Sequence, residues 1–532
     1  MTPPTLTSPG EAALRLMPEL SGRPPAERTA RHVLGRVLAS VAALVLVLGV
    51  VATGLLFTLR STDQFVHEDV AVASLPGSEL EEFSRWAKDV PAQPAAPVVL
   101  TYHDIQPEPV KSPYVVTPEA FARQMAMLQA AGYRSLTAAQ FVAYQKGSFT
   151  PPARSFLLTF DDGTAGLWRY ADSVLARFGF TAVSFLITGR VGTSKPYYLT
   201  WDLVEQMKAS GRWDFESHTA NLHTRVPVSP SGALGGALSH RMVVNGRLES
   251  RPEFEERIRR DLEQSIRDIT SHGLPRPVLF AYPFSDVVAS GVDGEEAAVP
   301  RTIVSTLFAA AFVDVAPGAL PASRREVLKQ VIGRAEVFHK DDELALFHRL
   351  QEMETLPVSS LDPLTVDSHW LEDGGAYPAP VQVTANRLTV DALTETYVTA
   401  GWAPQRTSDW VDYAVTCRAA GLLPDGANGA GLTVRVGSGD EVQVRVSQHS
   451  LQVTRGGRPV GAPMALAVAA AHQVEVVVRQ MSTTVRVDGR ELLVLASDPG
   501  PATFGGFGVV FSRTARSSAF PTLVGLHVNP VP

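Results

Sequence analysis

Residues 155–163 have the sequence Ser-Phe-Leu-Leu-Thr-Phe-Asp-Asp-Gly, and this stretch decides the fold class. A short, largely apolar run predicts a buried strand, and Gly163 turns the chain where the strand ends. The carboxylates of Asp161 and Asp162 then lie at the carboxyl end of the strand, where parallel α/β folds bind their ligands. An ordinary solvated Asp-Asp-Gly turn is the alternative interpretation.

Around this stretch, from Val98 to about Gln351, apolar strand-like runs alternate with segments of helical period. The alternation predicts parallel strands joined by crossover helices, in an open sheet or a barrel. A polar insertion at 226–250 is expected to form a long loop at the rim. The predicted strands are 98–102, 155–160, 181–187, 213–217, 278–282 and 311–315, and the predicted helices are 118–131, 167–178, 201–209, 252–271 and 301–310.

After Asp362 the pattern changes to short segments in which apolar and polar residues alternate, with turn signals such as Gly456-Gly457 between them. Closely spaced strands of this kind predict an antiparallel sandwich or jelly roll over 362–532. This pattern resembles concanavalin-like or laminin-G-like jelly rolls, which makes the region a candidate carbohydrate-binding module. Trp402 and Trp410 are candidates for stacking on sugar rings, although core packing is the preferred interpretation.

The N-terminal region contains an uncharged apolar stretch at 37–59 that is about 34 Å long as a helix, enough to cross a hydrocarbon core of about 30 Å. Arginines precede it and acidic residues follow it, so the positive-inside rule predicts a membrane helix with a cytoplasmic N-terminus. We expect a disordered tail at 1–36 and a stalk or linker at 60–96. A cleaved signal peptide and a buried core helix are the alternatives.

Overall charge and cysteine content exclude two classes of interaction. The formal net charge is −7 and no concentrated basic face is evident, which argues against a nucleic-acid partner. Cys417 is the only cysteine, so no intramolecular disulfide can form.

A second group of polar residues follows the predicted strand at 213–217, where His218 and His223 are five positions apart. This spacing does not suit one helix face, but a loop can aim both imidazoles at one point. Two imidazoles and a carboxylate form a familiar ligand set for a divalent metal with an open position. Capping or surface histidines are the alternative. Because the aspartate pair is expected at the same edge of the fold, the joint interpretation is a metal hydrolase site.

Two further strand ends carry candidate residues. His103 follows the first predicted strand of the domain, and Phe284 follows Pro283, which fixes the local backbone and could present an N–H to an oxyanion. A core histidine and an ordinary turn are the respective alternatives. The residues expected to contact substrate are Tyr102, Tyr282 and Asp286.

The sequence Leu158-Thr-Phe-Asp-Asp-Gly163 resembles the first motif of the polysaccharide deacetylases, the NodB-homology or family 4 carbohydrate esterases. The resemblance covers roughly 97–351 and implies a deacetylase domain at 97–355 with a distorted, incomplete (β/α) barrel. By the same resemblance Asp161 is the catalytic base, and Phe284 supplies its backbone N–H to the oxyanion. The implied metal ligands are Asp162, His218 and His223.

Two departures from the family pattern are informative. The histidine spacing has one extra residue, as in deacetylases of poly-β-1,6-N-acetylglucosamine, which also share the Tyr-His-Asp strand found at 102–104. The third motif lacks the arginine that supports the base, and Arg169 or Arg334 could replace it. No late histidine is evident, so His103 is the candidate general acid.

These features predict a membrane-anchored, metal-dependent enzyme that removes N-acetyl groups from an N-acetylglucosamine-containing exopolysaccharide or from peptidoglycan outside the cell membrane. Zinc is the expected metal, and iron, cobalt or nickel also suit the ligand set. An O-acetyl esterase acting on a glycan and a non-catalytic glycan-binding surface protein are the competing functions. The polymer and the oligomeric state are left open.

Overall fold

The computed structural model describes residues 36–53, 66–72, 74–88, 96–288, 294–314, 322, 331–365, 369–372, 378–498, 500, 503–516 and 518–532. It divides into two units, residues 1–64 and 65–532. The predicted N-terminal tail, except for Arg36, and the last six residues of the predicted membrane segment lie outside the described residues.

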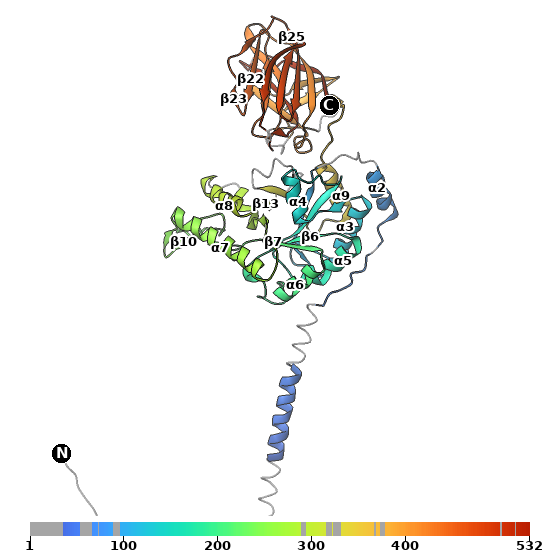
Figure 1. Cartoon of the computed structure of the whole chain (residues 1–532), viewed down its shortest axis with the longest axis vertical. Helices are drawn as coiled ribbons and strands as arrows, with labels where there is room; N and C mark the ends of the chain where they lie inside the picture. The colour runs from blue at the N-terminus through green and yellow to red at the C-terminus, as the bar shows by residue number, and fades with distance from the viewer. Residues whose placement is uncertain are drawn as a thin grey trace, which may run out of the picture. The chain divides into compact units, whose positions relative to one another are not determined.

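The first unit contains one described helix, Arg36–Thr53 (Figure 1). Its 18 residues have a mean hydropathy of 2.3, and none of this span is buried. By length and composition the helix can cross a membrane. It is therefore compatible with the predicted single-pass anchor, which stays a prediction.

The second unit begins with a ring of parallel strands (Figure 1). The strand order is β1-β14-β13-β12-β7-β6-β5, and β1 also pairs with β5, which closes the ring. The predicted (β/α) barrel is thereby confirmed. Its strands, with β4 attached to β5, are β1 (Val98–Tyr102), β4 (Arg134–Ser135), β5 (Ser155–Phe160), β6 (Ala182–Leu186), β7 (Trp213–Ser217), β12 (Leu279–Ala281), β13 (Ala310–Asp314) and β14 (Ile332–Glu336).

Helices lie outside the ring and begin at capping residues that the sequence supplies. Thr117 accepts a hydrogen bond from the Ala120 N–H at the start of α3, and Ser250 forms a capping box with Glu253 at the start of α7. The predicted helix 167–178 opens with a π-helical turn at Leu167–Ala171. The helices are α3 (Pro118–Ala130), α4 (Ala138–Gln145), α5 (Asp172–Phe178), α6 (Trp201–Ala209), α7 (Arg251–Ser271), α8 (Gly294–Leu307) and α9 (Glu343–Met353).

The insertion at 226–250 is more ordered than the predicted loop, because it forms two short antiparallel ladders. The Arg257 guanidinium of α7 donates to the Ala237 carbonyl at 2.6 Å and to Glu249 Oε1 at 2.8 Å, which holds the insertion on the helix. The strands are β8 (Arg225–Pro227), β9 (Leu234–Gly236), β10 (Val243–Val244) and β11 (Arg247–Leu248).

Within the predicted stalk at 60–96, the described residues 66–72 and 74–88 contact the barrel. Val70, which precedes α2 (Gly77–Lys88), and Phe83 within α2 are buried in the same apolar cluster as residues of β1 and β5. His67 Nε2 also lies 2.8 Å from Asp172 Oδ2 of α5. Most residues of this segment are polar, but a few apolar side chains attach it to the barrel.

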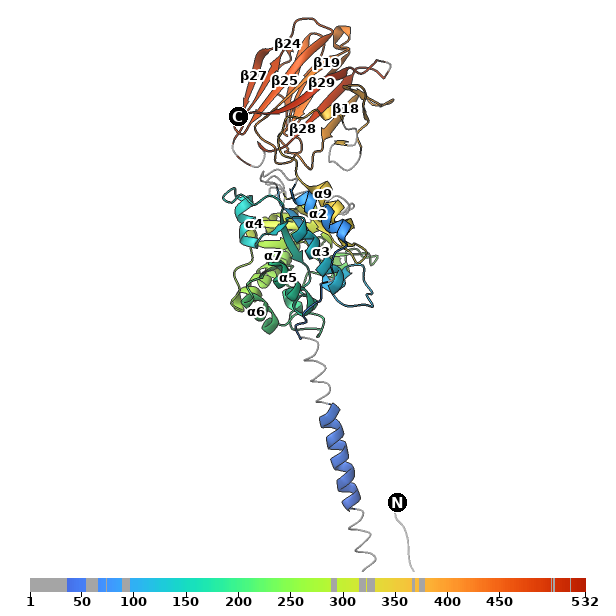
Figure 2. The same cartoon turned by 90° about the vertical axis from the view of Figure 1, so that its right-hand side faces the viewer.

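The C-terminal region is all-β, as predicted, with two antiparallel sheets around one apolar core (Figure 2). Trp402 and Trp410 are 8% and 3% exposed and pack in this core, which confirms the preferred interpretation. One sheet contains β15 (Trp370–Leu371), β18 (Tyr397–Trp402), β28 (Phe507–Arg513), β20 (Asn428–Val434), β21 (Val442–Val446), β22 (Ser450–Arg455), β23 (Arg458–Pro459) and β24 (Met464–Ala465). The other contains β16 (Val381–Val383), β17 (Arg387–Val390), β29 (Thr522–Pro530), β19 (Tyr413–Ala420), β25 (Ala471–Arg479), β26 (Ser482–Val487) and β27 (Arg490–Ala496).

Candidate active site and metal centre

The aspartate pair follows β5 at a sharp turn. The Asp161 N–H donates to the Tyr102 carbonyl at 3.0 Å and so continues the pairing with β1. Asp162 and Gly163 then have φ values of 72° and 73°, so the backbone reverses and the two carboxylates point in different directions. Glycine suits this turn, because position 163 has a left-handed φ of 73° and an added Cβ would lie 2.7 Å from Leu186 Cδ2.

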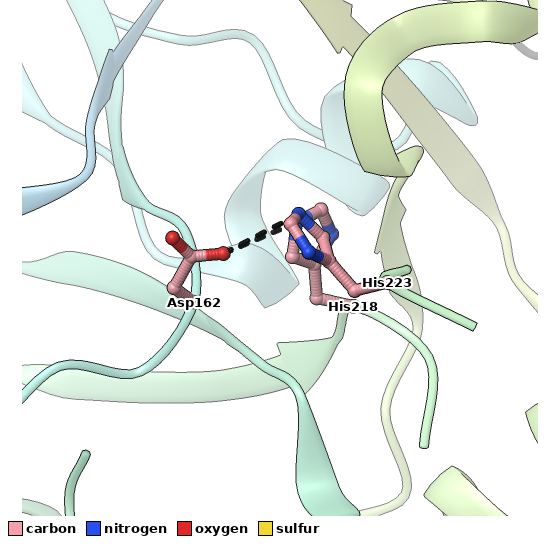
Figure 3. Close-up of side chains that lie close together, drawn as sticks. All are labelled: Asp162, His218 and His223. Carbon is pink, nitrogen blue, oxygen red and sulfur yellow. Dashed lines mark ion pairs between the residues drawn. The ribbon is translucent and has the colours of Figure 1, made fainter. Parts of the chain in front are cut away.

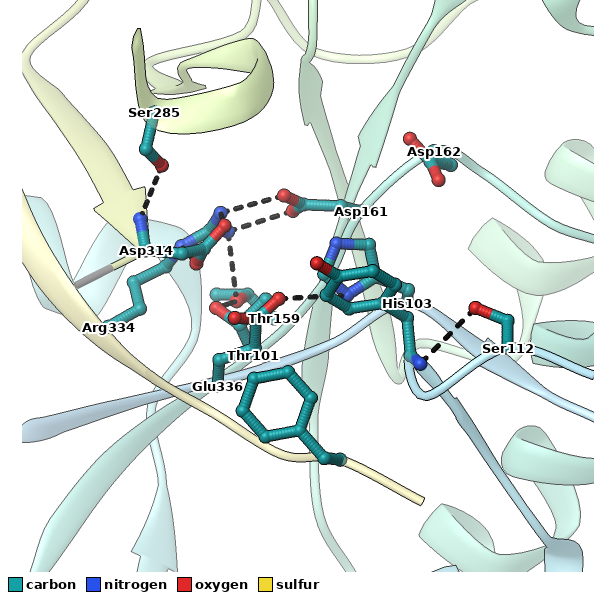
Figure 4. A network of polar contacts seen from close by, with 12 residues as sticks. Thr101, His103, Ser112, Thr159, Asp161, Asp162, Ser285, Asp314, Arg334 and Glu336 are labelled. Atoms are coloured by element: carbon teal, nitrogen blue, oxygen red, sulfur yellow. Dashed lines mark hydrogen bonds and ion pairs between the residues drawn. The ribbon is translucent and has the colours of Figure 1, made fainter. Parts of the chain in front are cut away.

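Asp161 is held by a bidentate arginine (Figure 4). The Arg334 guanidinium donates to the two Asp161 oxygens at 2.8 Å and 2.7 Å, and its Nε lies 3.0 Å from Asp314 Oδ1. Arg334 and Asp161 are 0% and 2% exposed. Of the two arginines named from the sequence, Arg334 therefore contacts the aspartate, whereas Arg169 pairs with Glu68.

Opposing effects act on the pKa of Asp161. Burial raises the pKa of this carboxyl, but the adjacent Arg334 guanidinium and the nearby His218 imidazole lower it more. The pKa of Asp161 is therefore held below its ordinary value, and the carboxylate stays ionised at neutral pH. An ionised carboxylate that a guanidinium holds in a fixed orientation can accept a proton.

We expect Arg334→Met to lower the free energy of unfolding by about 3–5 kcal/mol, because it leaves the buried carboxylate of Asp161 without its partner. Arg169→Met is the matched control, since the Arg169–Glu68 pair is partly exposed (28% and 43%). We expect this control to cost only about 0–1 kcal/mol. Urea unfolding followed by tryptophan fluorescence measures both, and equal losses would contradict the buried pair.

Asp162, His218 and His223 converge on one point (Figure 3). His218 is fixed by its N–H, which donates to the Leu186 carbonyl at 2.9 Å, and by Nδ1, which lies 2.8 Å from the Ala281 carbonyl. Because Nδ1 is used in this way, Nε2 is the free ring nitrogen. The Nε2 atoms of His218 and His223 lie 3.7 Å and 3.5 Å from Asp162 Oδ1.

These three donors fit a divalent metal. Asp162 Oδ1 is buried and has no hydrogen-bond partner among the described residues, so a cation would satisfy it. Two ligand atoms of a tetrahedral zinc lie about 3.3–3.4 Å apart, close to the observed separations. Burial raises the pKa of Asp162 and lowers the pKa values of His218 and His223, and the neutral imidazole is the form that binds metal.

A second group of potential ligands, His103, Asp161 and Asp314, has its ligand atoms within 4.8 Å of one another. The Arg334 guanidinium already contacts both carboxylates, so the positive charge that a second metal would supply is present. His103 Nδ1 instead lies 3.8 Å from Glu336 Oε1, is buried, and has no hydrogen-bond partner among the described residues. Burial, with a contribution from the charge of Asp314, raises the pKa of Glu336 to about 7.

Phe284 lies in the turn Pro283–Val288 that follows β12. Phe284 and Ser285 have φ values of 58° and 52°, a left-handed conformation that is uncommon for such residues. The Ser285 hydroxyl holds the turn by accepting a hydrogen bond from the Asp314 N–H at 2.7 Å. The Phe284 ring packs 4.5 Å from the His223 ring and is 39% exposed, so this turn borders the metal centre.

The three residues expected to contact substrate are buried in the structure. Tyr102 is fully buried and donates to Gln124 Oε1 at 2.9 Å, so its side chain has no surface for a substrate. Tyr282 is 1% exposed. Asp286 Oδ2 accepts a hydrogen bond from the Gly236 N–H at 3.1 Å and ties the insertion to the Phe284 turn.

Sequence reasoning missed Asp314 and Glu336. Both lie at the carboxyl ends of strands, β13 and β14, next to Arg334. The signal that would have found them is the rule that already found Asp161: a charged residue at the end of a parallel strand. Asp314 could have been found in this way, because its strand was predicted at 311–315, whereas Glu336 could not, because β14 was not predicted.

The comparison with protein families agrees with this geometry. Residues 149–294 match the family model described as polysaccharide deacetylase. This segment holds the aspartate pair, both histidines and the Phe284 turn. The chain therefore carries a polysaccharide deacetylase domain of the NodB-homology class.

Within this class, the chain is similar to poly-beta-1,6-N-acetyl-D-glucosamine N-deacetylases. It is 25% identical to the Escherichia coli enzyme over 286 residues, which are 48% of this chain and 42% of that protein. It is 36% identical to the Staphylococcus epidermidis enzyme over 114 residues, 21% of this chain and 39% of that protein. The matched segments thus span less than half of these relatives. Among solved structures, a de-N-acetylase from Aggregatibacter actinomycetemcomitans aligns with a TM-score of 0.40 and 21% identity, covering 47% of this chain and 98% of that one.

Proposed function

We propose that this protein is a metal-dependent N-deacetylase that acts on a β-1,6-linked N-acetylglucosamine polymer. The observation that carries the proposal is the pair of adjacent carboxylates with divided roles. Asp161 is paired with a buried arginine, whereas Asp162 faces two imidazoles with an oxygen that no other described residue hydrogen bonds. The matched relatives act on this polymer according to their names, which supports the choice of substrate.

Asp162, His218 and His223 would hold the ion, with zinc as the first choice and iron, cobalt or nickel as alternatives. When bound, the metal would supply Lewis-acid polarisation of the acetyl carbonyl and acidification of water. Asp161 accepts the proton of the attacking water, because its carboxylate is ionised and held next to the triad; His218 Nε2 lies 3.8 Å from Asp161 Oδ2. Arg334 keeps the carboxylate in this orientation.

Two further groups complete the mechanism. The Phe284 N–H would donate to the oxyanion that develops at the acetyl carbonyl, an interaction worth about 3–4 kcal/mol in the transition state. His103 would donate a proton to the departing amine, and Glu336, at 3.8 Å from its Nδ1, would orient the ring. Release of the amine and acetic acid leaves Asp161 protonated and His103 deprotonated, and proton transfer from Asp161 to His103 through solvent restores both groups.

We also propose that the helix Arg36–Thr53 anchors the protein in the cell membrane with the deacetylase domain outside the cytoplasm. The length and hydropathy of this helix support the anchor, and the arginines before it support the orientation. An extracytoplasmic domain would meet a secreted polymer directly.

We expect the full-length, zinc-loaded protein in detergent to release acetate from poly-β-1,6-N-acetylglucosamine oligomers and to convert them to partly deacetylated products. Mass spectrometry of the oligomers, with peptidoglycan strands and acetylxylan as parallel substrates, measures this result. Release from acetylxylan alone would favour an O-acetyl esterase, and release from peptidoglycan alone would identify a different polymer. A protein that binds zinc but releases no acetate from any of them would favour a glycan-binding role.

A further inference from the structure

One face of α7 is directed at the loop that joins the two ligand histidines. Asp261, Ser265 and Asp268 are four and three residues apart, a spacing that places them on the same side of a helix. Each hydrogen bonds to a segment beside the metal centre: Asp261 to the backbone of residues 220 and 221, Ser265 to Ser217, and Asp268 to Thr188. This face therefore does not act as an ordinary solvated helix surface.

Asp261 uses both carboxylate oxygens on the loop. Oδ1 accepts a hydrogen bond from the Ala220 N–H at 2.8 Å, and Oδ2 accepts one from the Asn221 N–H at 2.8 Å. Two consecutive backbone donors are thus bound by one side chain. An asparagine could not reproduce this arrangement, because its amide has one oxygen and would turn its NH₂ towards one of the two N–H donors.

The two ligand histidines differ in how they are held. His218 is fixed to barrel strands through the carbonyls of Leu186 and Ala281. Among the described residues, no hydrogen bond to a strand carbonyl fixes the His223 ring, which packs against Phe284. The position of His223 relative to His218 therefore depends on the path of the four residues between them.

That path is not set by a regular helix. Thr219 has a φ of 73°, in the left-handed region. The N–H groups of Thr188 and Gly189 donate to the carbonyls of Thr219 and Ala220 at 3.1 Å and 3.0 Å. The loop carbonyls are thus held from one side, and Asp261 holds the N–H groups from the other.

We propose that Asp261 is a positioning residue for the metal centre: its carboxylate fixes the loop between the ligand histidines so that His223 Nε2 reaches the point shared with His218 and Asp162. This inference rests on the proposed function, because it concerns the same metal triad. Asp261 itself contacts neither the imidazoles nor the expected ion. Asp261 acts through the loop backbone. Its substitution should therefore lower the metal affinity more than the stability of the fold.

The test compares zinc binding by the full-length protein in detergent, measured by competition with a chromophoric chelator, for the wild type and Asp261→Asn. We expect the variant to bind zinc about ten- to a hundred-fold more weakly, the range for residues that orient metal ligands. The thermal midpoint of the zinc-free protein should stay near that of the wild type. Glu263→Gln is the matched control, because Glu263 lies on the same helix and pairs only weakly with Arg267 at 3.7 Å.

Unchanged zinc affinity in Asp261→Asn would overturn the inference, and so would an equal loss in Glu263→Gln. If Asp261→Asn does not fold, Asp261→Glu carries the same measurement, because it keeps the charge but displaces the oxygens. Asp162→Ala separates this inference from the proposed function. If Asp162→Ala abolishes zinc binding while Asp261→Asn has no effect, only the positioning role fails; if the wild type binds no zinc, the proposed function fails.

Discussion

Asp161→Asn is expected to reduce kcat for deacetylation by about 10²–10⁴-fold, the range for loss of a general base. Asparagine has nearly the same shape as aspartate but cannot accept the proton of the attacking water. Zinc binding should be retained, because Asp162, His218 and His223 are unchanged. Acetate release at saturating oligomer and zinc content by elemental analysis measure the two effects separately.

Asp202→Asn is the control for this substitution, because Asp202 lies exposed in the first turn of α6. We expect it to leave kcat unchanged. If the Asp161→Asn protein contains zinc and still turns over at the wild-type rate, Asp161 is not the base. A variant that loses zinc as well would indicate that Asp161 helps to hold the ion.

His218→Ala is expected to abolish both zinc binding and turnover. His218 is 2% exposed and is the ligand that the barrel strands fix most firmly, so its loss removes a preoriented donor. We expect zinc affinity to fall by more than about a hundred-fold, beyond the range for a residue behind a ligand. Chelator competition measures the affinity, and acetate release measures turnover.

The matched control here is His348→Ala, since His348 lies exposed on α9 and only approaches Glu82 at 3.4 Å. This variant should bind zinc like the wild type. Full zinc content in His218→Ala would refute the ligand set, whereas loss of zinc with retained turnover would refute the metal dependence of the reaction.

The local sequence predicted those residues of the site that follow clearly apolar strands. Asp161 follows a strand of six buried residues, and His218 follows β7, so both strand ends could be recognised without a structure. Their meeting point followed from one rule, because parallel strands direct their carboxyl ends to the same face.

The support of the site was harder to predict. β14 has the sequence Ile-Gly-Arg-Ala-Glu, with few apolar residues, because Arg334 and Glu336 serve the charged site. Asp261 lies on a helix whose charged residues resemble an ordinary solvated surface. Arg334 and Asp261 each hydrogen bond to a segment that is distant in the sequence. A local sequence pattern cannot predict such a contact.

Domain boundaries were predicted from composition and were least accurate where composition is mixed. The segment at 66–88 is largely polar, yet a few apolar side chains such as Phe83 attach it to the barrel. The all-β region was easier, because alternation of apolar and polar residues is a direct consequence of one buried face.

The Asp161–Arg334 pair also limits when a newly made chain can become active. The two residues are 173 positions apart, and Arg334 lies on the strand that pairs with β1 to help close the ring. A nascent or truncated chain that stops before Ile332 has the aspartate without its guanidinium. A chain that ends between His223 and Ile332 would contain all three proposed metal ligands but would lack Arg334. We therefore expect such a chain to be inactive, because the proposed base has no partner to hold it.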